Sequence, residues 1–333
     1  MEISAFCDMY PAAAEKLNQD ISGGRGKVFS DYNELLKEDL DAVCVLTPNN
    51  THSEISIAAL KAGKHVICEK PMAITYNEAR AMLDARDESG KILSIGYQER
   101  FRLDSLYLKE ECKNGTLGEI YFAKATALRR RAVPTWGVFL DREKQGGGPL
   151  IDIGTHSLDL ALFMMDNYEP SHVLGTAYQK LNTAKNQGNA WGDWDHKKHK
   201  VEDSAFALIV MKNGASIILE TSWALNITDE KEAVCTLCGT KGGAEMQRGG
   251  DLLLNGVKNN KPYNFSPLLK PGSYSFYTGG NDKSSDREAR NFRDAILGRE
   301  KPYVLPEKAA VVTQILEGIY KSAATGKAYH FND

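Results

Sequence analysis

Short apolar runs alternate with amphipathic segments through the first hundred residues of the chain. The runs are rich in β-branched and other apolar residues, which predicts strands, and the segments between them have the 3.6-residue period of helices. Strands joined by helices of this length form βαβ crossovers, so we expect an α/β fold with a parallel sheet and helices on both of its faces. The predicted strands are 2–8, 41–48, 65–71 and 92–98, and the predicted helices are 10–21, 50–63 and 75–90.

Beyond residue 100 the alternation is replaced by strands in succession. A helix at 104–118, a strand at 119–131 and a glycine loop leading into an apolar helix come first. Successive strands flanked by helices favour an α+β domain built on a large, mostly antiparallel, open sheet. Because 333 residues exceed one ordinary core, we divide the chain into domains 1–100 and 101–333. The later strands are predicted at 172–181, 203–214, 215–225 and 232–240, and the later helices at 284–298 and 306–325.

The composition is that of a globular protein without an excess of charge. Hydrophobic residues make up 42% and charged residues 26% of the chain, and the formal net charge is −3. This charge gives no general attraction to nucleic acid or to an anionic membrane surface. The sequence also has no apolar run of the roughly 18 residues that a membrane span needs. We therefore expect neither a nucleic-acid partner nor a membrane partner.

The six cysteines are scattered, mostly within apolar strand-like runs. This pattern indicates buried thiols in a reducing compartment and hence a cytoplasmic location, on the condition that no export signal precedes Met1. Cys235 and Cys238 form a C-x-x-C pair, but a strand places residues three apart on opposite faces. Because no second Cys/His pair with zinc-site spacing accompanies them, we predict two packing cysteines and no metal site.

The helix that follows the glycine loop has one polar stripe in apolar surroundings. In GGGPLIDIGTHSLDL, residues 146–160, the side chains of Asp152, His156 and Asp159 are at i, i+4 and i+7. At 3.6 residues per turn these positions share one face, so the stripe must point toward something polar. A structural histidine needs no acids beside it, which favours a catalytic role for His156.

The ends of the predicted parallel strands also have side chains suited to bind a ligand or to take part in a reaction. A doubly wound sheet binds its ligand beyond the carboxyl ends of its strands. Asp8 ends the first strand, where an acid either hydrogen-bonds the ribose diol of NAD and repels the extra phosphate of NADP, or simply caps a turn. The second strand ends in LTPNNTH, residues 46–52, before a helix N-terminus that suits a phosphate or carbonyl, although His52 also fits a solvated first turn. The third ends in Glu69-Lys70-Pro71, which puts a lysine at the rim where a nicotinamide would lie.

Together these motifs resemble the Gfo/Idh/MocA family, the relatives of glucose-fructose oxidoreductase and inositol 2-dehydrogenase. The resemblance includes TPNNTH, EKP, GYQERF, GGGPLIDIGTHSLDL, VEDSAFALIVMKNGASIILETSW and YKSAATGKAY, so it runs through nearly the whole chain. It implies a Rossmann-like, N-terminally incomplete NAD(P)-binding domain at 1–100, a substrate-binding and oligomerisation domain at 101–333, and oxidation of a sugar, cyclitol or related polyol, with NAD favoured over NADP. Carried over residue by residue, the family's lysine is Lys70, its aspartate Asp152 and its histidine His156. The residues expected to contact NAD are Asp8, Thr47, Pro48, Asn49, His52, Glu69, Lys70 and Gln98.

The three family residues suit the oxidation of a secondary alcohol. A base with a pKa near the working pH must take the hydroxyl proton as hydride leaves carbon, and the imidazole of His156 meets this requirement. Lys70 is suited to stabilise the developing alkoxide. Asp152 is suited to bind a substrate hydroxyl or to orient the imidazole.

The glycine-rich turn G-x-G-x-x-G with which the family's nucleotide domain opens is missing from this sequence. The first residues already match the second strand of the family pattern. The glycine cluster at 22–26 follows a helix and not a strand, so we interpret it as a surface loop. Two explanations compete, a chain shortened at its N-terminus and a natural variant that binds its cofactor poorly. Loss of a central strand would leave an unpaired apolar edge, which favours the shortened chain.

The second domain offers candidates for substrate contacts near the polar helix. Tryptophan faces stack on sugar rings, and arginine forks grip hydroxyls or carboxylates. Alternation puts Arg129 and Arg131 on one face of their strand and Arg130 on the other. The polar loop 182–200 has His and Asp side chains that could suggest a metal site. We do not favour this, because the sequence indicates no further residues that would hold such ligands in place. The predicted substrate contacts are Arg129, Arg131, Trp136, Trp191, Trp194 and His196.

Three functions fit these residues. The first is an NAD-dependent dehydrogenase of sugars or polyols. The second, which the family also contains, is glycoside cleavage through transient oxidation of the sugar, which recycles NAD. The third is a sugar-binding protein that has lost catalysis together with its phosphate loop. A broad exposed sheet in the second domain also predicts a homodimer or homotetramer through that face.

Overall fold

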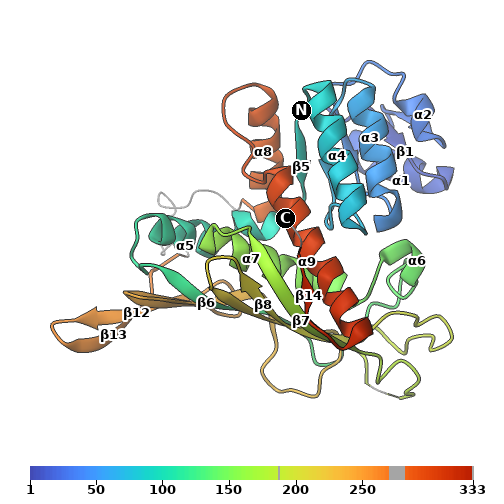
Figure 1. The fold of residues 1–333 in the computed structure, drawn as a ribbon. Helices are drawn as coiled ribbons and strands as arrows, with labels where there is room; N and C mark the ends of the chain where they lie inside the picture. The colour runs from blue at the N-terminus through green and yellow to red at the C-terminus, as the bar shows by residue number, and fades with distance from the viewer. Residues whose placement is uncertain (187, 270–281, 332–333) are drawn as a thin grey trace.

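The chain folds into an α/β region followed by a large sheet with helices packed on one face (Figure 1). The computed structural model describes residues 1–186, 188–269 and 282–331. Within these ranges, no helix is long and apolar enough to cross a lipid bilayer.

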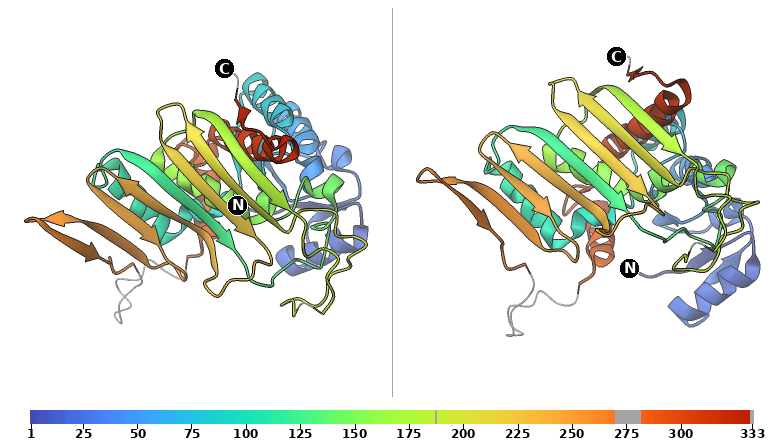
Figure 2. Two further views of the ribbon diagram at one scale, coloured as in Figure 1. Left: turned by 60° about the horizontal axis from the view of Figure 1, so that its bottom comes forward. Right: turned by 90° about the horizontal axis from the view of Figure 1, so that it is seen from below.

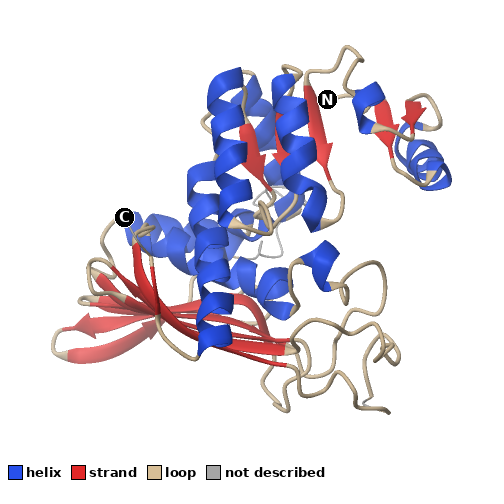
Figure 3. Cartoon of the chain, turned by 45° about the vertical axis from the view of Figure 1, so that its right-hand side comes forward, coloured by secondary structure: helices blue, strands red, loops and turns tan. Residues whose placement is uncertain are grey.

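The parallel strands of the α/β region form two separate sheets (Figure 3). β3 (Ala42–Val45), β4 (His65–Cys68) and β5 (Leu93–Ile95) make a three-stranded sheet, and β1 (Ala5–Cys7) pairs with β2 (Lys27–Phe29). The predicted parallel pairing is confirmed, but the single sheet that we expected is divided, because β1 and β3 do not pair with each other.

Local signals explain where the helices of this region begin and end. The side chains of Thr75 and Glu78 form a capping box at the start of α4, and Gly90 ends that helix in the left-handed conformation. The pattern did not indicate β2 or α2, because each is only three or four residues long. The helices are α1 (Pro11–Ser22), α2 (Tyr32–Leu35), η1 (Asn49–Thr51), α3 (His52–Lys61), α4 (Tyr76–Ser89) and η2 (Gln98–Phe101).

Within the described residues, nine strands form the large sheet of the second region, in the order β13-β12-β11-β10-β6-β9-β8-β7-β14. Every neighbouring pair is antiparallel except β6 and β9, so the predicted mostly antiparallel sheet is confirmed. β11, β12, β13 and β14 extend the sheet beyond the predicted strands. The bounds are β6 (Ile120–Leu128), β7 (Pro170–Tyr178), β8 (Ser204–Met211), β9 (Ser216–Ser222), β10 (Lys231–Gly239), β11 (Gly242–Met246), β12 (Leu252–Lys258), β13 (Lys261–Phe265) and β14 (Tyr329–His330).

Helices cover one face of this sheet and leave the other face open (Figure 2). α7 packs against β6 and β10, and α9 packs against β7. The inward residues of β6 are alanines, which lets α7 approach the sheet closely. The helices of this region are α5 (Leu103–Lys113), α6 (Arg142–Gln145), the π-helical turn η3 (Leu150–Gly154), α7 (Thr155–Met165), α8 (Ser284–Ile296) and α9 (Pro306–Thr325).

The two regions pack against each other through helices from both. α4 contacts α9, and η2 contacts α8 and α7. Arg100 in η2 forms a buried ion pair with Asp159 in α7. The domain boundary that we placed at residue 100 falls within η2, and it stays a prediction.

Candidate active site

The lysine at the end of β4 and the aspartate of the polar helix meet where the two regions join. The Nζ atom of Lys70 donates to the backbone oxygen of Asp152 at 2.7 Å and to Oδ1 of the same residue at 3.2 Å. Their side chains are only 17% and 10% exposed, so the ion pair is mostly shielded from water. Two groups 82 residues apart in sequence therefore form one polar centre.

The polar stripe is divided, contrary to the single face that we expected. Asp152 lies in the π-helical turn η3, so the segment from Asp152 to His156 is not a regular α-helix. Asp159 faces Arg100, which donates to it from Nε at 2.8 Å and from an Nη atom at 2.6 Å. The second acid of the stripe is thus part of a structural ion pair and not of the polar centre.

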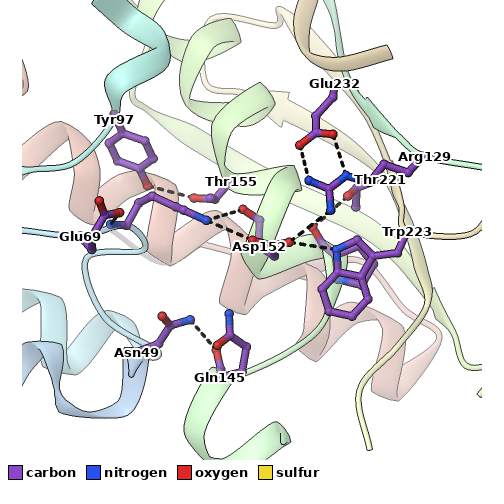
Figure 4. Close-up of polar contacts among 12 residues, drawn as sticks. Asn49, Glu69, Tyr97, Arg129, Gln145, Asp152, Thr155, Thr221, Trp223 and Glu232 are labelled. Atoms are coloured by element: carbon purple, nitrogen blue, oxygen red, sulfur yellow. Dashed lines mark hydrogen bonds and ion pairs between the residues drawn. The ribbon is translucent and has the colours of Figure 1, made fainter. Parts of the chain in front are cut away.

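Two side chains from the large sheet complete the surroundings of Asp152 (Figure 4). Nε1 of Trp223 donates to Oδ2 of Asp152 at 3.0 Å, and an Nη atom of Arg129 lies 3.9 Å from the same oxygen. Arg129 also forms a two-pronged pair with Glu232, with N···O distances of 2.6 and 2.5 Å. Both carboxylate oxygens of Asp152 are therefore bound by donors, which fixes the orientation of the carboxylate.

His156 is enclosed next to this centre as a neutral base. Burial lowers its pKa well below 6.5, and the positive charges of Lys70 and Arg129 lower it further. Its Nδ1 atom is buried and has no hydrogen-bond partner among the described residues, so Asp152 does not orient the imidazole as one of our alternatives required. Instead the ring lies edge to face with Tyr97, whose hydroxyl is 3.0 Å from Oγ1 of Thr155.

A buried carboxylate holds the glycine loop that leads into this helix. The backbone N–H of Gly148 donates to both oxygens of Glu202 at 2.9 Å, and the hydroxyl of Tyr320 donates at 2.8 Å. Burial raises the pKa of Glu202. A Cβ on Gly147 would collide with the Tyr320 hydroxyl, and one on Gly148 with the backbone oxygen of Glu202. The glycines are therefore required for close packing against Glu202 and Tyr320.

The predicted cofactor contacts divide into exposed and enclosed groups. Thr47, Pro48 and Glu69 are exposed at the carboxyl ends of β3 and β4, the edge at which Lys70 also lies, and their contact with NAD stays a prediction. Gln98 is half-buried at the start of η2. Asp8 follows β1 in the other sheet, and its carboxylate accepts a hydrogen bond from the N–H of Tyr10 at 2.8 Å, which is the turn-cap arrangement.

Two of these predicted contacts hold loops together. His52 is buried, so it is not the solvated first-turn residue that we considered. Its ring nitrogens lie 2.8 Å from the backbone oxygen of Pro71 and 2.9 Å from that of Thr47, which ties together the loops after β3 and β4. Asn49 is also buried, and its amide donates to the backbone oxygen of Gln145 at 2.9 Å.

The predicted substrate residues lie in different surroundings. The guanidinium of Arg129 lies 5.5 Å from the ring centre of Trp191, which packs edge to face on Trp136, and both tryptophans are about half exposed. Trp194 is buried, with its indole N–H bonded to the backbone oxygen of Asn182, so it cannot line a cleft as we predicted. Arg131 donates to the backbone oxygen of Ala224 and to Asn226, and His196 is half-buried in the polar loop.

The cysteines and the polar loop form no metal cluster in the described part of the chain. No three His, Cys, Asp or Glu side chains gather there as a metal site would require. Cys235 is buried and Cys238 half-buried on β10, and both are free thiols.

Several residues of the site were not among our candidates. Trp223 donates to Asp152, and Tyr97 lies edge to face with His156. Thr155 contacts the hydroxyl of Tyr97, and Glu202 and Tyr320 hold the glycine loop. Trp223 and Tyr97 each follow a strand, β9 and β5, and strand ends are the positions at which we looked for ligands. The sequence signal of Trp223 and Tyr97 is therefore their position just after a strand.

Comparison with known proteins agrees with this architecture. Residues 1–97 match a family described as "Oxidoreductase family, NAD-binding Rossmann fold", and residues 105–245 match the "GFO/IDH/MocA C-terminal domain". A D-glucoside 3-dehydrogenase of Escherichia coli (strain K12) is 36% identical, over 98% of this chain and 89% of that protein. A myo-inositol 2-dehydrogenase of Thermotoga maritima is 30% identical over 60% of this chain and 55% of that protein.

Solved structures show the same fold. An oxidoreductase domain protein from Kribbella flavida matches with a TM-score of 0.85 and 22% identity, covering 100% of this chain and 91% of that one. A levoglucosan dehydrogenase in complex with NADH and L-sorbose matches with a TM-score of 0.84 and 22% identity, over 99% and 90% of the two chains. The predicted fold class, NAD cofactor and oxidoreductase activity are confirmed. The chain belongs to the Gfo/Idh/MocA family of NAD-binding oxidoreductases.

Proposed function

We propose that this protein oxidises a secondary hydroxyl group of a glucoside or a closely related sugar. The observation on which this rests is the meeting of Lys70 and Asp152 beside the neutral imidazole of His156. The similarity to a D-glucoside 3-dehydrogenase, which extends over 98% of this chain, supports a glucoside as the substrate. When bound, NAD supplies the hydride acceptor.

Each of the three residues has a distinct task in this proposal. The Nδ1 atom of His156 is enclosed, which leaves Nε2 to take the proton of the substrate hydroxyl. The ammonium group of Lys70 donates to the same oxygen and stabilises its developing negative charge. Asp152 holds Lys70 in place through Oδ1, and its Oδ2 is oriented by Trp223.

The sugar ring itself is proposed to lie against the aromatic pair beside Arg129. Trp136 and Trp191 are 51% and 43% exposed, an unusual degree for tryptophan in a folded protein. Apolar ring faces stack on the C–H faces of sugars, and the guanidinium of Arg129 offers hydrogen-bond donors to hydroxyls.

The direct test is NADH formation by the purified protein with NAD and a panel of methyl glucosides and cyclitols. We expect absorbance of NADH to appear with a glucoside. Cleavage of the glycosidic bond without net NADH would indicate transient oxidation instead. Sugar binding by calorimetry without either reaction would indicate a binding protein and would refute the proposal.

The pH dependence of the reaction should reflect the lowered pKa of His156. Because the neutral imidazole is the form that accepts a proton, kcat/KM for oxidation should stay constant as the pH falls through 6.5 and decrease only below it. Replacing Arg129 with methionine removes one of the positive charges that lower this pKa, so the decrease should begin at a higher pH. Arg131→Met serves as the control, since Arg131 contacts Ala224 and Asn226 and is not among the charges that lower the pKa of His156. An unchanged pH profile in Arg129→Met would contradict this role.

We propose that the open face of the large sheet forms the contact between subunits of a homodimer or homotetramer. Leu174, Leu208 and Ile218 are paired in register on neighbouring strands and are 36–49% exposed. Light scattering should give the mass of two or four chains, and Leu208→Glu should reduce it to that of one chain. Leu297→Glu, an exposed leucine outside this face, should leave the mass unchanged. A single-chain mass for the parent protein would rule the interface out.

We also propose a cytoplasmic location and a domain boundary near residue 100. All six cysteines are free thiols, as expected for a reducing compartment.

A further inference from the structure

Arg129 also lines a second space that has no part in the proposed chemistry. This pocket has a volume of about 510 Å³, and its lining includes neither Lys70 nor His156 nor Trp191. Its walls come from the start of α5, the end of β6, the start of β10, the turn between β11 and β12 and the start of α8. Because Arg129 reaches to within 3.9 Å of Asp152, the pocket begins one side chain away from the catalytic candidates.

Most charges in the pocket wall are already neutralised. Most of the acidic side chains that line the pocket form ion pairs with basic side chains. The wall therefore contains many charged groups but has a small net charge. Such a wall does not select for a strongly anionic or cationic ligand. The pairs are Arg102 with Asp104, Arg129 with Glu232, and Asp282 with Arg290.

Several polar groups in the wall keep free hydrogen-bonding capacity. Arg248 has no hydrogen bond or ion pair among the described residues, and Arg287 gives one guanidinium nitrogen to the backbone oxygen of Phe101. The carboxylate of Glu230 accepts from the N–H of Arg130, which leaves an oxygen available. The pocket thus presents both donors and an acceptor.

Apolar side chains lie among these polar groups. Leu103, Leu128 and Leu269 contribute to the same wall. The pocket wall thus combines paired charges, hydrogen-bond donors and acceptors, and apolar side chains. An uncharged ring with many hydroxyl groups suits such a wall, because it has hydroxyls at its rim and C–H groups on its faces.

We infer that this pocket is a second subsite, which binds the aglycone of a glycoside when that aglycone is itself a neutral sugar ring. The inference rests on the proposed function, and it makes disaccharides the preferred substrates. A glucosyl ring held at Asp152 would extend its substituent past Arg129 into the pocket. Arg248 and Glu230 would then hydrogen-bond the second ring.

The test compares three substrates of the intact protein with NAD: a methyl glucoside, a glucosyl disaccharide and a glucoside with a carboxylated phenyl aglycone. We expect kcat/KM for the disaccharide to exceed that for the methyl glucoside on the order of tenfold. Arg248→Ala should remove this preference and leave the kinetics of the methyl glucoside unchanged. Arg130→Ala is the matched control, because Arg130 is a neighbouring exposed arginine that does not line the pocket, and it should keep the preference.

Each other result would overturn the inference. Equal kcat/KM for the disaccharide and the methyl glucoside would leave the proposed function intact and remove the subsite. A preference for the carboxylated aglycone would assign the pocket to anions. Loss of activity on all substrates in Arg248→Ala would show that Arg248 acts on the glucosyl ring itself. If none of the glucosides forms NADH, the proposed function fails first and the subsite fails with it.

Discussion

A Lys70→Met variant should form NADH about 10²- to 10⁴-fold more slowly than the parent protein while it binds NAD with similar affinity. The ammonium group of Lys70 is mostly buried, and its distances of 2.7 and 3.2 Å to oxygens of Asp152 place it at the centre of the site. In the proposed reaction it stabilises negative charge that develops only as the hydroxyl proton leaves, so its loss should lower kcat more than it raises KM. Stopped-flow or steady-state absorbance of NADH measures the rate, and calorimetric titration measures NAD affinity.

Two further variants make this result specific. Lys70→Arg keeps the charge but not the compact ammonium geometry, so we expect partial activity between those of the parent and Lys70→Met. Lys61→Met changes an exposed lysine at the end of α3 and should leave the rate unchanged. A Lys70→Met protein that turns over near the parent rate would exclude the assigned role.

Replacing Arg100 with methionine should destabilise the folded protein by about 3–5 kcal/mol. Arg100 and Asp159 are 0% and 1% exposed and form a two-pronged pair, with the guanidinium also stacked 4.7 Å from the ring centre of Phe163. Burial raises the pKa of Asp159, and Arg100 is the group that opposes this rise. Without Arg100, the carboxylate is left uncompensated in the interior, which is the costly situation for a buried charge. Urea unfolding followed by circular dichroism measures the change.

A double variant separates the buried charge from the packing of the arginine. Arg100→Met with Asp159→Leu removes both charges, so it should recover a large part of the lost stability. Arg299→Met removes an exposed arginine that pairs with Asp294, which keeps Arg293 as a partner, so stability should change by less than about 0.5 kcal/mol. If the double variant is no more stable than Arg100→Met alone, the loss comes from packing and not from the unpaired carboxylate.

The sequence predicted most of the longer strands and helices, but it missed β11, β12 and β13 and the shortest elements. β2, α2 and β14 have only two to four residues, which is too few to show the hydrophobic period of a strand or a helix. The polar stripe shows a different limit. A regular helix puts Asp152, His156 and Asp159 on one face, but a π-helical turn and a buried arginine from η2 separate the two acids. Neither the extra residue in the turn nor the partner from another element is visible in a helical period.

The tryptophans of the polar loop show the same limit at the level of burial. Trp191 and Trp194 are three residues apart in one loop and have similar sequence surroundings, yet Trp191 is exposed next to Arg129 and Trp194 is buried in a small apolar cluster. An irregular loop has no repeating geometry from which the direction of a side chain can be inferred.

The amino-acid sequence by itself determined the two kinds of sheet, the helices between them, and the placing of Lys70 at a strand end and His156 on a helix. These features follow from backbone geometry, which acts on each residue and its near neighbours and therefore leaves a local pattern. Only the tertiary structure decided that Asp152 is bound by Lys70, Trp223 and Arg129. It alone also decided that Asp159 forms an ion pair with Arg100. These partners come from segments up to 82 residues away, and their meeting depends on how whole elements pack, which no local pattern records.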